Sequence, residues 1–198
     1  MNGVKYILIT LIGVCFSIGY FYFPYVKTTG LLNIDLKSII QPGDLVFSVG
    51  KSLKSDMVRM LDSNSDIEYS HVGLVLGCNN GTIYIAHMSI DKGYIVCETI
   101  QDFIQASNSV ELGFYRLRAP PDKERLCHII DSLVEMKKKF DHTFDLSNDK
   151  EYYCSEMVYK VLKEVNPNIY KGIQYHRYLY PADLINDSMV IEIKKVKL

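Results

Sequence analysis

Two short apolar runs on either side of a turn-rich pentapeptide constrain the fold of this chain more than any other feature. Residues 72–76 and 82–86 are largely β-branched, aliphatic or aromatic, and residues 77–81 between them consist of glycine, cysteine and asparagine. Apolar runs joined by a Gly/Asn turn are typical of an antiparallel hairpin. A fold built only from alternating strands and helices around a parallel sheet is therefore disfavoured.

The other elements expected from the sequence mix strands and helices without regular alternation. Strands are predicted after the Pro42–Gly43 turn and near 94–97, 112–117 and 189–193, and helices over 52–61, 101–105, 122–138 and 154–165. This order favours an α+β fold in which helices pack against an antiparallel sheet. The 198 residues, of which 48% are hydrophobic, are enough for one buried core.

The N-terminal segment departs from this globular pattern. No charged residue occurs from Tyr6 to Val26, a length close to the roughly 20 apolar residues that cross a bilayer. A cleaved signal peptide is the alternative, but the run is aromatic-rich and lacks a small-x-small cleavage site; Val14 before Cys15 disfavours a lipoprotein. We predict an uncleaved transmembrane helix over 1–28, a linker over 29–40 and one folded domain over 41–198.

Charge and cysteine content argue against several functions. The net charge is −1, so nucleic acid is not an expected partner. The five cysteines show no CxxC spacing, which argues against a zinc ribbon or a disulfide framework, and we expect neither a metal nor a cofactor. Lysines near the C-terminus fall in a predicted strand, where a solvated sheet edge is expected, at Lys194, Lys195 and Lys197.

Cys154 occupies a position that suits a reactive thiol. Apolar residues recur at helical spacing from Met157 to Val165, and Asn166–Pro167 ends the run, so Cys154 falls in the first turn on the buried stripe. The positive end of a helix lowers a thiol pKa, and the thiolate is the reactive form. The alternative is a small buried side chain without chemistry.

The histidines supply candidate partners for this cysteine. If the hairpin loop is 78–80, then His71 and His87 lie directly opposite each other on neighbouring strands, whereas an Asn80–Gly81 turn would break this register. A base and a second polar group that orients it are what nucleophilic catalysis by cysteine requires. Other interpretations are two structural histidines or a shared metal, and His142 and His176 are further candidates.

A set of motifs in a particular order identifies a family that this chain resembles. The motifs are Pro42-Gly43-Asp44, Tyr69-Ser70-His71-Val72-Gly73, Phe140-Asp141 with Phe144-Asp145, Tyr153-Cys154-Ser155-Glu156 and Pro181-Ala182-Asp183-Leu184. Together they are similar to the YiiX-like permuted NlpC-type papain-fold cysteine hydrolases. The resemblance implies a circularly permuted papain-like fold. It also implies that Cys154 is the nucleophile, that His71 is the general base and that His87 takes the third position.

Several further expectations follow for the site. The backbone N–H of Cys154, with Tyr153 or Tyr152, is expected to bind the oxyanion. The acidic residues of the motifs are expected to cap turns and helices rather than to react, namely Asp44, Asp141, Asp145 and Glu156.

The sequence therefore predicts a membrane-tethered thiol hydrolase with its domain outside the cytoplasm. Its substrate would be a small amide or peptide, and the resemblance extends to cell-wall peptides and acylated lysine-like amides. The alternatives are a non-catalytic binding module that keeps the groove, and a lipid acyl hydrolase or acyltransferase.

Overall fold

A computed structural model describes residues 35–52, 55, 58, 68–171 and 178–198 of the chain. The predicted anchor over 1–28 and most of the helix predicted over 52–61 lie outside the described residues. Within the described part, no helix is long and apolar enough to cross a membrane. Residues Asp35–Ile39 form helix α1, inside the range predicted as linker, and Leu36 is buried.

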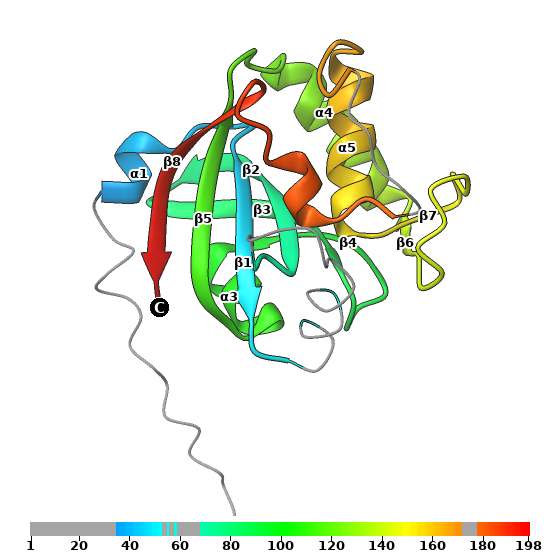
Figure 1. The fold of residues 1–198 in the computed structure, drawn as a ribbon, viewed down its shortest axis with the longest axis horizontal. Coiled ribbons are helices and arrows are strands. Elements are labelled where there is room, and N and C mark those ends of the chain that lie inside the picture. Colours follow the sequence, from blue (N-terminus) through cyan, green and yellow to red (C-terminus); the bar gives the residue numbers. More distant parts are fainter. Residues whose placement is uncertain (1–34, 53–54, 56–57, 59–67, 172–177) are drawn as a thin grey trace, which may run out of the picture. The chain divides into compact units, whose positions relative to one another are not determined.

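A single eight-stranded sheet organises the domain, with the strand order β7-β6-β4-β3-β2-β1-β5-β8 (Figure 1). Its strands are β1 Leu45–Gly50, β2 His71–Asn79, β3 Thr82–Ser89, β4 Tyr94–Thr99, β5 Ser109–Leu117, β6 Lys139–Phe140, β7 Glu151–Tyr152 and β8 Val190–Lys197. The C-terminal strand β8 pairs with β5 at one edge of the sheet, as the lysine-rich sequence predicts.

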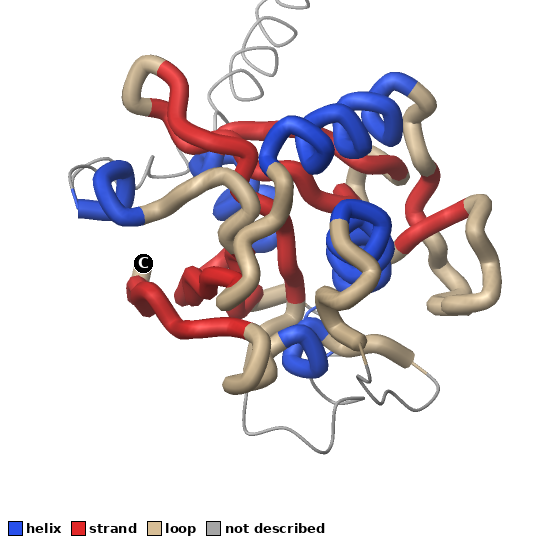
Figure 2. The backbone as a smooth tube through the Cα atoms, turned by 90° about the horizontal axis from the view of Figure 1, so that it is seen from above, coloured by secondary structure: helices blue, strands red, loops and turns tan. Residues whose placement is uncertain are grey.

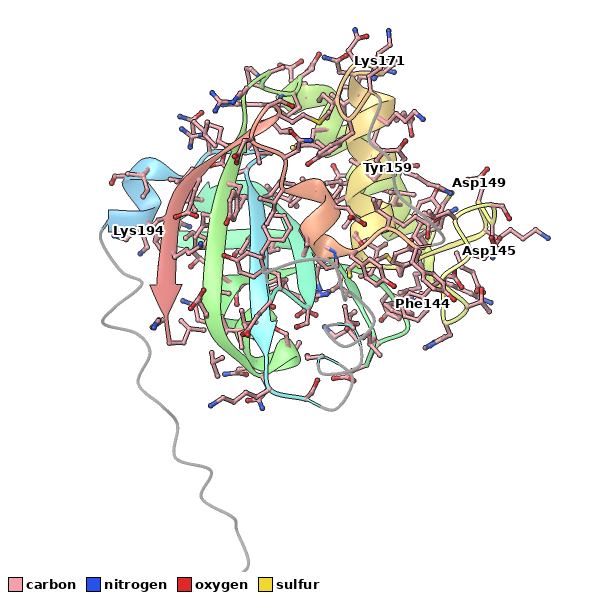
Figure 3. The ribbon with its side chains drawn as sticks, in the orientation of Figure 1. Phe144, Asp145, Asp149, Tyr159, Lys171 and Lys194 are labelled. Atoms are coloured by element: carbon pink, nitrogen blue, oxygen red, sulfur yellow. The ribbon has the colours of Figure 1, made fainter. Side chains whose placement is uncertain are left out.

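The sheet is mixed, which corrects the predicted antiparallel sheet. All pairs are antiparallel except β6 and β7, which run parallel. The connection between them, residues 141–150, carries the chain back to the end of the sheet from which β6 started. The Asp141 carboxylate folds this connection, because it accepts the backbone N–H groups of Thr143 and Asp145, each at 2.7 Å. Figure 3 shows Phe144, Asp145 and Asp149 along this loop.

The hairpin between β2 and β3 has a different turn from the predicted one. The turn residues are Asn80 and Gly81, both with positive φ (48° and 75°), and Asn79 pairs with Thr82. Two consecutive positive φ angles define the type I′ turn, which Asn-Gly adopts because its twist matches that of the strands. The predicted 78–80 loop, and the direct pairing of the two histidines that depended on it, are therefore wrong.

A β-bulge nevertheless restores the two histidines to one face of the sheet. The register set by the turn would place His87 opposite Leu74, on the face away from His71. Leu76 is an extra residue on β2, and beyond it the register shifts by one, so that Leu74 faces Ala86. His87 then comes opposite Gly73, which shares the face of His71.

Helices pack on both faces of the sheet, and Figure 2 shows helices in blue beside the red strands. Helices α4 (Lys123–Glu135) and α5 (Cys154–Val165) bury one apolar stripe each in a core shared with alternate sheet residues such as Leu45 and Met88. Helix α3 (Ile100–Ser107) buries Phe103 against the opposite face, where His71 and His87 lie. The short 3-10 helix η2 (Pro181–Leu184) contacts α5.

Side-chain caps explain where these helices begin. The Asp122 carboxylate accepts the N–H groups of Glu124 and Arg125 at 3.0 and 3.1 Å and starts α4. Thr99 accepts the N–H of Asp102 at 3.2 Å and starts α3. The predicted helix over 122–138 is thus confirmed in position, although it ends at Glu135, before Lys137 takes a positive φ.

Candidate active site

Cys154 is the first residue of α5, as the helical spacing predicts. The backbone N–H of Tyr153 donates to Oε2 of Glu156 at 3.3 Å, which fixes the start of the helix. Cys154 is only 9% exposed, and the backbone N–H of Val72 in β2 is close enough to its sulfur to lower the thiol pKa. The thiol therefore lies beside the residue that follows His71.

The electrostatics of the thiol differ from the expectation. A helix N-terminus lowers a thiol pKa, but here burial raises the pKa of Cys154, and the N–H groups of Ser155 and Val72 offset only part of that effect. The thiol is therefore protonated at neutral pH. Any nucleophilic attack by this sulfur needs a base that takes its proton as the attack proceeds.

His71 and His87 form a hydrogen-bonded pair across β2 and β3. Nε2 of His71 lies 3.0 Å from Nδ1 of His87, and the two rings meet edge to face with centroids 5.1 Å apart. Burial, with a smaller effect of His87, lowers the pKa of His71 to about 3. His71 is thus neutral at pH 7, and Nδ1 is the ring nitrogen that His87 does not engage.

Phe103 of α3 holds both imidazoles in place. Its ring stacks on His71 at 5.2 Å between centroids and 25° between planes, and it meets His87 edge-on at 5.0 Å. Phe103 is fully buried. Because protein interiors are packed at crystal-like density, the buried Phe103 ring restricts the rotamers of both histidines.

Glu98 of β4 is a polar group at the site that sequence reasoning missed. Its Oε2 lies 3.7 Å from Nε2 of His87, and its other oxygen pairs with the ammonium of Lys92. The register brings it there, since Ile85 faces Glu98 and Glu98 is therefore a diagonal neighbour of His87 on the same face. Period-two alternation in the run Tyr94–Thr99 was the signal that could have found it.

A comparison with family models finds a match over most of the chain. The model described as permuted papain-like amidase enzyme, YaeF/YiiX, C92 family, matches residues 39–195. This chain belongs to that family. The crystal structure of the metalloprotein yiiX from Escherichia coli O157:H7 is similar with a TM-score of 0.63 at 17% identity, covering 81% of this chain and 99% of that one. At that identity the likeness shows the fold. No curated protein sequence matches the chain.

That neighbour is described as a metalloprotein, so we asked whether side chains of this chain are placed to bind a metal ion. Among the described residues, no group of three or more His, Cys, Asp or Glu side chains is placed to hold a metal ion. His71 and His87 offer two nitrogens that face each other, whereas a tetrahedral zinc site needs three or four protein donors. His142 is exposed against Phe140, and His176 lies outside the described residues.

Two cavities of different character flank the candidate site of this amidase-family chain. One, of about 100 Å³, lies on the Cys154 side and is lined mainly by apolar and aromatic groups, among them Phe144, Tyr153, Tyr178 and Leu179. The other, of about 330 Å³, lies on the side of His71 and His87 and is lined by several serines and Asp91 together with apolar side chains such as Met88 and Ile90. Val58 borders both cavities.

The two tyrosines proposed for the oxyanion occupy different places. Tyr153 lines the apolar cavity beside Cys154, and its hydroxyl oxygen accepts the N–H of Leu179 at 3.0 Å. Tyr152 instead lies under the ammonium groups of Lys138 and Lys160, 4.3 and 4.7 Å from its ring centroid, and is not among the residues that line this cavity.

The acidic motif residues have structural partners. Asp44 forms two contacts of 2.8 Å with the Arg116 guanidinium, and its carboxylate accepts the N–H of Gln41. Glu156 is fully buried, and its second oxygen pairs with Lys160 at 2.9 Å. These interactions anchor β1 and the start of α5, which hold the candidate site from either side.

Proposed function

We propose that this chain is a thiol hydrolase that cleaves amide bonds through an acyl-enzyme on Cys154. Membership in a family of permuted papain-like amidases supports this reaction class. The observation that carries the residue assignment is the convergence of Cys154, at the N-terminus of α5, with the Val72 N–H next to His71, whose Nε2 is held 3.0 Å from His87. In this proposal Cys154 is the nucleophile, His71 the base and His87 the group that orients it.

The reaction then runs in two balanced halves. Nδ1 of His71 takes the thiol proton as sulfur attacks the carbonyl carbon, and returns it to the nitrogen of the leaving amine when the C–N bond breaks. Water next attacks the thioester, gives its proton to His71 and releases the acid, while the sulfur regains a proton. Because the thiol and imidazole are both neutral at rest, proton transfer accompanies attack instead of preceding it.

The oxyanion of the tetrahedral intermediate would form at the positive end of α5. The backbone N–H of Cys154 is one donor at this end, and the Tyr153 hydroxyl is a second, since its oxygen accepts from Leu179 and its own proton remains to be donated. Loss of one such donor costs about 10²–10³ in rate in well-studied hydrolases.

The two cavities suggest how a substrate would lie. The acyl part stays on sulfur after the first step, so it belongs to the small apolar cavity beside Cys154. The leaving amine receives its proton from His71 and therefore belongs to the larger, serine-lined cavity. A substrate with a short apolar acyl group and a polar amine would fill both cavities. This favours an acyl-amine or a small peptide over a long-chain lipid ester.

Trapping the acyl-enzyme tests the residue assignment. The purified full chain is incubated with p-nitrophenyl acetate and with N-acetyl and N-butyryl aminomethylcoumarin amides, and the acyl mass is located by peptide mass spectrometry. We expect acylation of Cys154 in the wild type, none in Cys154→Ala and at least about 10²-fold slower acylation in His71→Ala. Cys78→Ala, which removes an exposed thiol, is the matched control and should react as the wild type. Equal labelling of all four proteins would overturn the proposal.

A non-catalytic binding module is the second candidate, and the raised pKa of the Cys154 thiol is the observation that favours it. The two candidates differ in the role of His71. A binding module keeps its ligand affinity in Cys154→Ala and turns over no amide, whereas the hydrolase loses turnover in both Cys154→Ala and His71→Ala. Isothermal calorimetry beside the turnover assay separates them.

We also propose that the uncharged segment Tyr6–Val26 anchors the enzyme in a membrane with its domain outside the cytoplasm. The support is the length of the run, which matches a bilayer. Membrane fractions from expressing cells should retain the full chain after alkaline carbonate washing, and added protease should digest the domain in spheroplasts. Release by carbonate, or protection from protease, would contradict the two parts of this proposal.

A further inference from the structure

A further polar side chain lies next to His87, on the side away from His71. Nε2 of His87 is buried and has no hydrogen-bond partner among the described residues, yet Oε2 of Glu98 faces it at 3.7 Å. The His87 side chain is 1% exposed and that of Glu98 10% exposed. A buried imidazole N–H without an acceptor loses its hydrogen bond to water without a replacement, so an acceptor at this position has a clear physical role.

The surroundings hold Glu98 ionised and aimed at His87. Its pKa is lowered to about 2, first by His87 and then by Lys92, against the opposing effect of burial. Lys92 pairs with the second carboxylate oxygen, which leaves Oε2 for His87. Asp102 of α3 and Tyr94 at the start of β4 also raise the pKa of Lys92. An ionised carboxylate can only accept hydrogen bonds, so the proton between the two groups must sit on His87 Nε2.

That single constraint sets the tautomer of both histidines. When Nε2 carries the one ring proton of His87, Nδ1 is unprotonated and must accept from His71. His71 then carries its proton on Nε2 and leaves Nδ1 unprotonated. Without the carboxylate, His87 could instead carry its proton on Nδ1 and donate to His71, which would move the His71 proton to Nδ1 and block it as a base.

We propose that Glu98 is a positioning residue for the hydrolysis, which acts through His87 to keep Nδ1 of His71 free to accept the thiol proton. This inference rests on the proposed function for its effect on rate, but the tautomers that it predicts do not depend on activity. It adds a fourth residue to the site, on β4, the strand next to that of His87.

Two variants of the full chain separate the charge of Glu98 from its hydrogen-bonding role. Glu98→Ala removes the acceptor and should lower the acylation rate by p-nitrophenyl acetate about 10- to 100-fold in kcat with little change in KM, the range typical for outer groups that orient a histidine. Glu98→Gln keeps an acceptor oxygen without the charge and should fall between Glu98→Ala and the wild type. Glu135→Ala, which removes an exposed carboxylate at the end of α4, is the matched control and should retain the activity.

Nitrogen–proton NMR correlation spectra of the imidazole rings give the readout that a merely structural role would not move. The wild type should show both His71 and His87 protonated at Nε2, and Glu98→Ala should shift His87 toward its Nδ1 tautomer. Unchanged tautomers together with unchanged kcat in a folded Glu98→Ala protein would overturn the inference. If Cys154→Ala is acylated as the wild type, the proposed function fails, while the tautomer shift still decides the role of Glu98.

Discussion

The thiol side and the imidazole side of this site are built by different physical devices. Cys154 is placed by a helix start, and its burial follows from the apolar stripe of α5. His71, His87 and Glu98 are placed by the register of three strands, including one bulge, and by the wedge of Phe103. The thiol side is local in sequence, whereas the imidazole side depends on pairing between distant residues.

The thiol side and the imidazole side also differ in what shifts their pKa values. Burial acts on both and favours the neutral forms, raising the pKa of the thiol and lowering that of His71. On the imidazole side, His87 adds to the effect of burial on the pKa of His71, whereas on the thiol side backbone N–H groups and the Ser155 side chain oppose the effect of burial. In the proposed mechanism the neutral imidazole therefore takes the proton of the neutral thiol.

The largest expected effect comes from removing the base. His71→Ala should lower the acylation rate of Cys154 about 10³-fold, since general-base catalysis typically contributes 10²–10⁴-fold. His142→Ala, which changes an exposed histidine packed only on Phe140 among the described rings, should leave the rate unchanged. Stopped-flow release of p-nitrophenol measures both. If His142→Ala slowed acylation as much as His71→Ala, the base would lie in the loop before Cys154, and the contrast between the thiol side and the imidazole side would not hold.

Phe103→Ala tests the packing that supports the imidazole side. Truncation of a fully buried phenylalanine costs about 3–5 kcal/mol in the free energy of unfolding, and here it also frees both imidazole rings to rotate. We expect a lower urea midpoint and slower acylation. Phe114→Ala, which truncates another fully buried phenylalanine, should cost similar stability without the same loss of rate.

Gly73→Ala tests the pairing of β2 with β3 and should have a smaller effect. A Cβ at this position would come 2.7 Å from Cγ2 of Ile85, 2.9 Å from the Ala86 carbonyl oxygen and 3.2 Å from Cβ of His87. Such overpacking typically costs about 1–3 kcal/mol, and it displaces His87 from His71. Acylation should slow while alkylation of Cys154 by iodoacetamide at high pH stays the same. Slowing of both reactions to the same degree would show that the two sides are not independent.

The smallest effect is a pH dependence of stability that originates from His71. Its folded pKa of about 3 lies below the ordinary value of 6.5, so the unfolded chain binds more protons between these values and stability falls as the pH is lowered through this window. At pH 5.5 the loss relative to pH 8 is about 1.4 kcal/mol from this group. Urea unfolding of the wild type and His71→Gln at both pH values measures it. An equal loss in the variant would assign the effect to other groups.

The sequence-based prediction of the histidine pair shows where sequence reasoning succeeds and fails. The two strands and the antiparallel pairing were predicted correctly, because turn residues and apolar runs are local signals. The turn was placed wrongly, and the contact between His71 and His87 exists because a bulge at Leu76 compensates for the Asn80–Gly81 turn. A bulge is decided by the packing of both faces of the sheet, which a hairpin sequence alone does not reveal.

The sequence by itself determined the elements with strong periodicity, the position of Cys154 at the start of α5, and the family to which the chain belongs. Tertiary structure alone decided the mixed pairing of β6 with β7, the approach of Glu98 to His87, and the protonation preferences of the thiol and His71. The physical reason is the sequence separation over which each interaction acts. Helix spacing and turn chemistry act within a few residues, whereas strand register and desolvation depend on groups brought together from the whole domain.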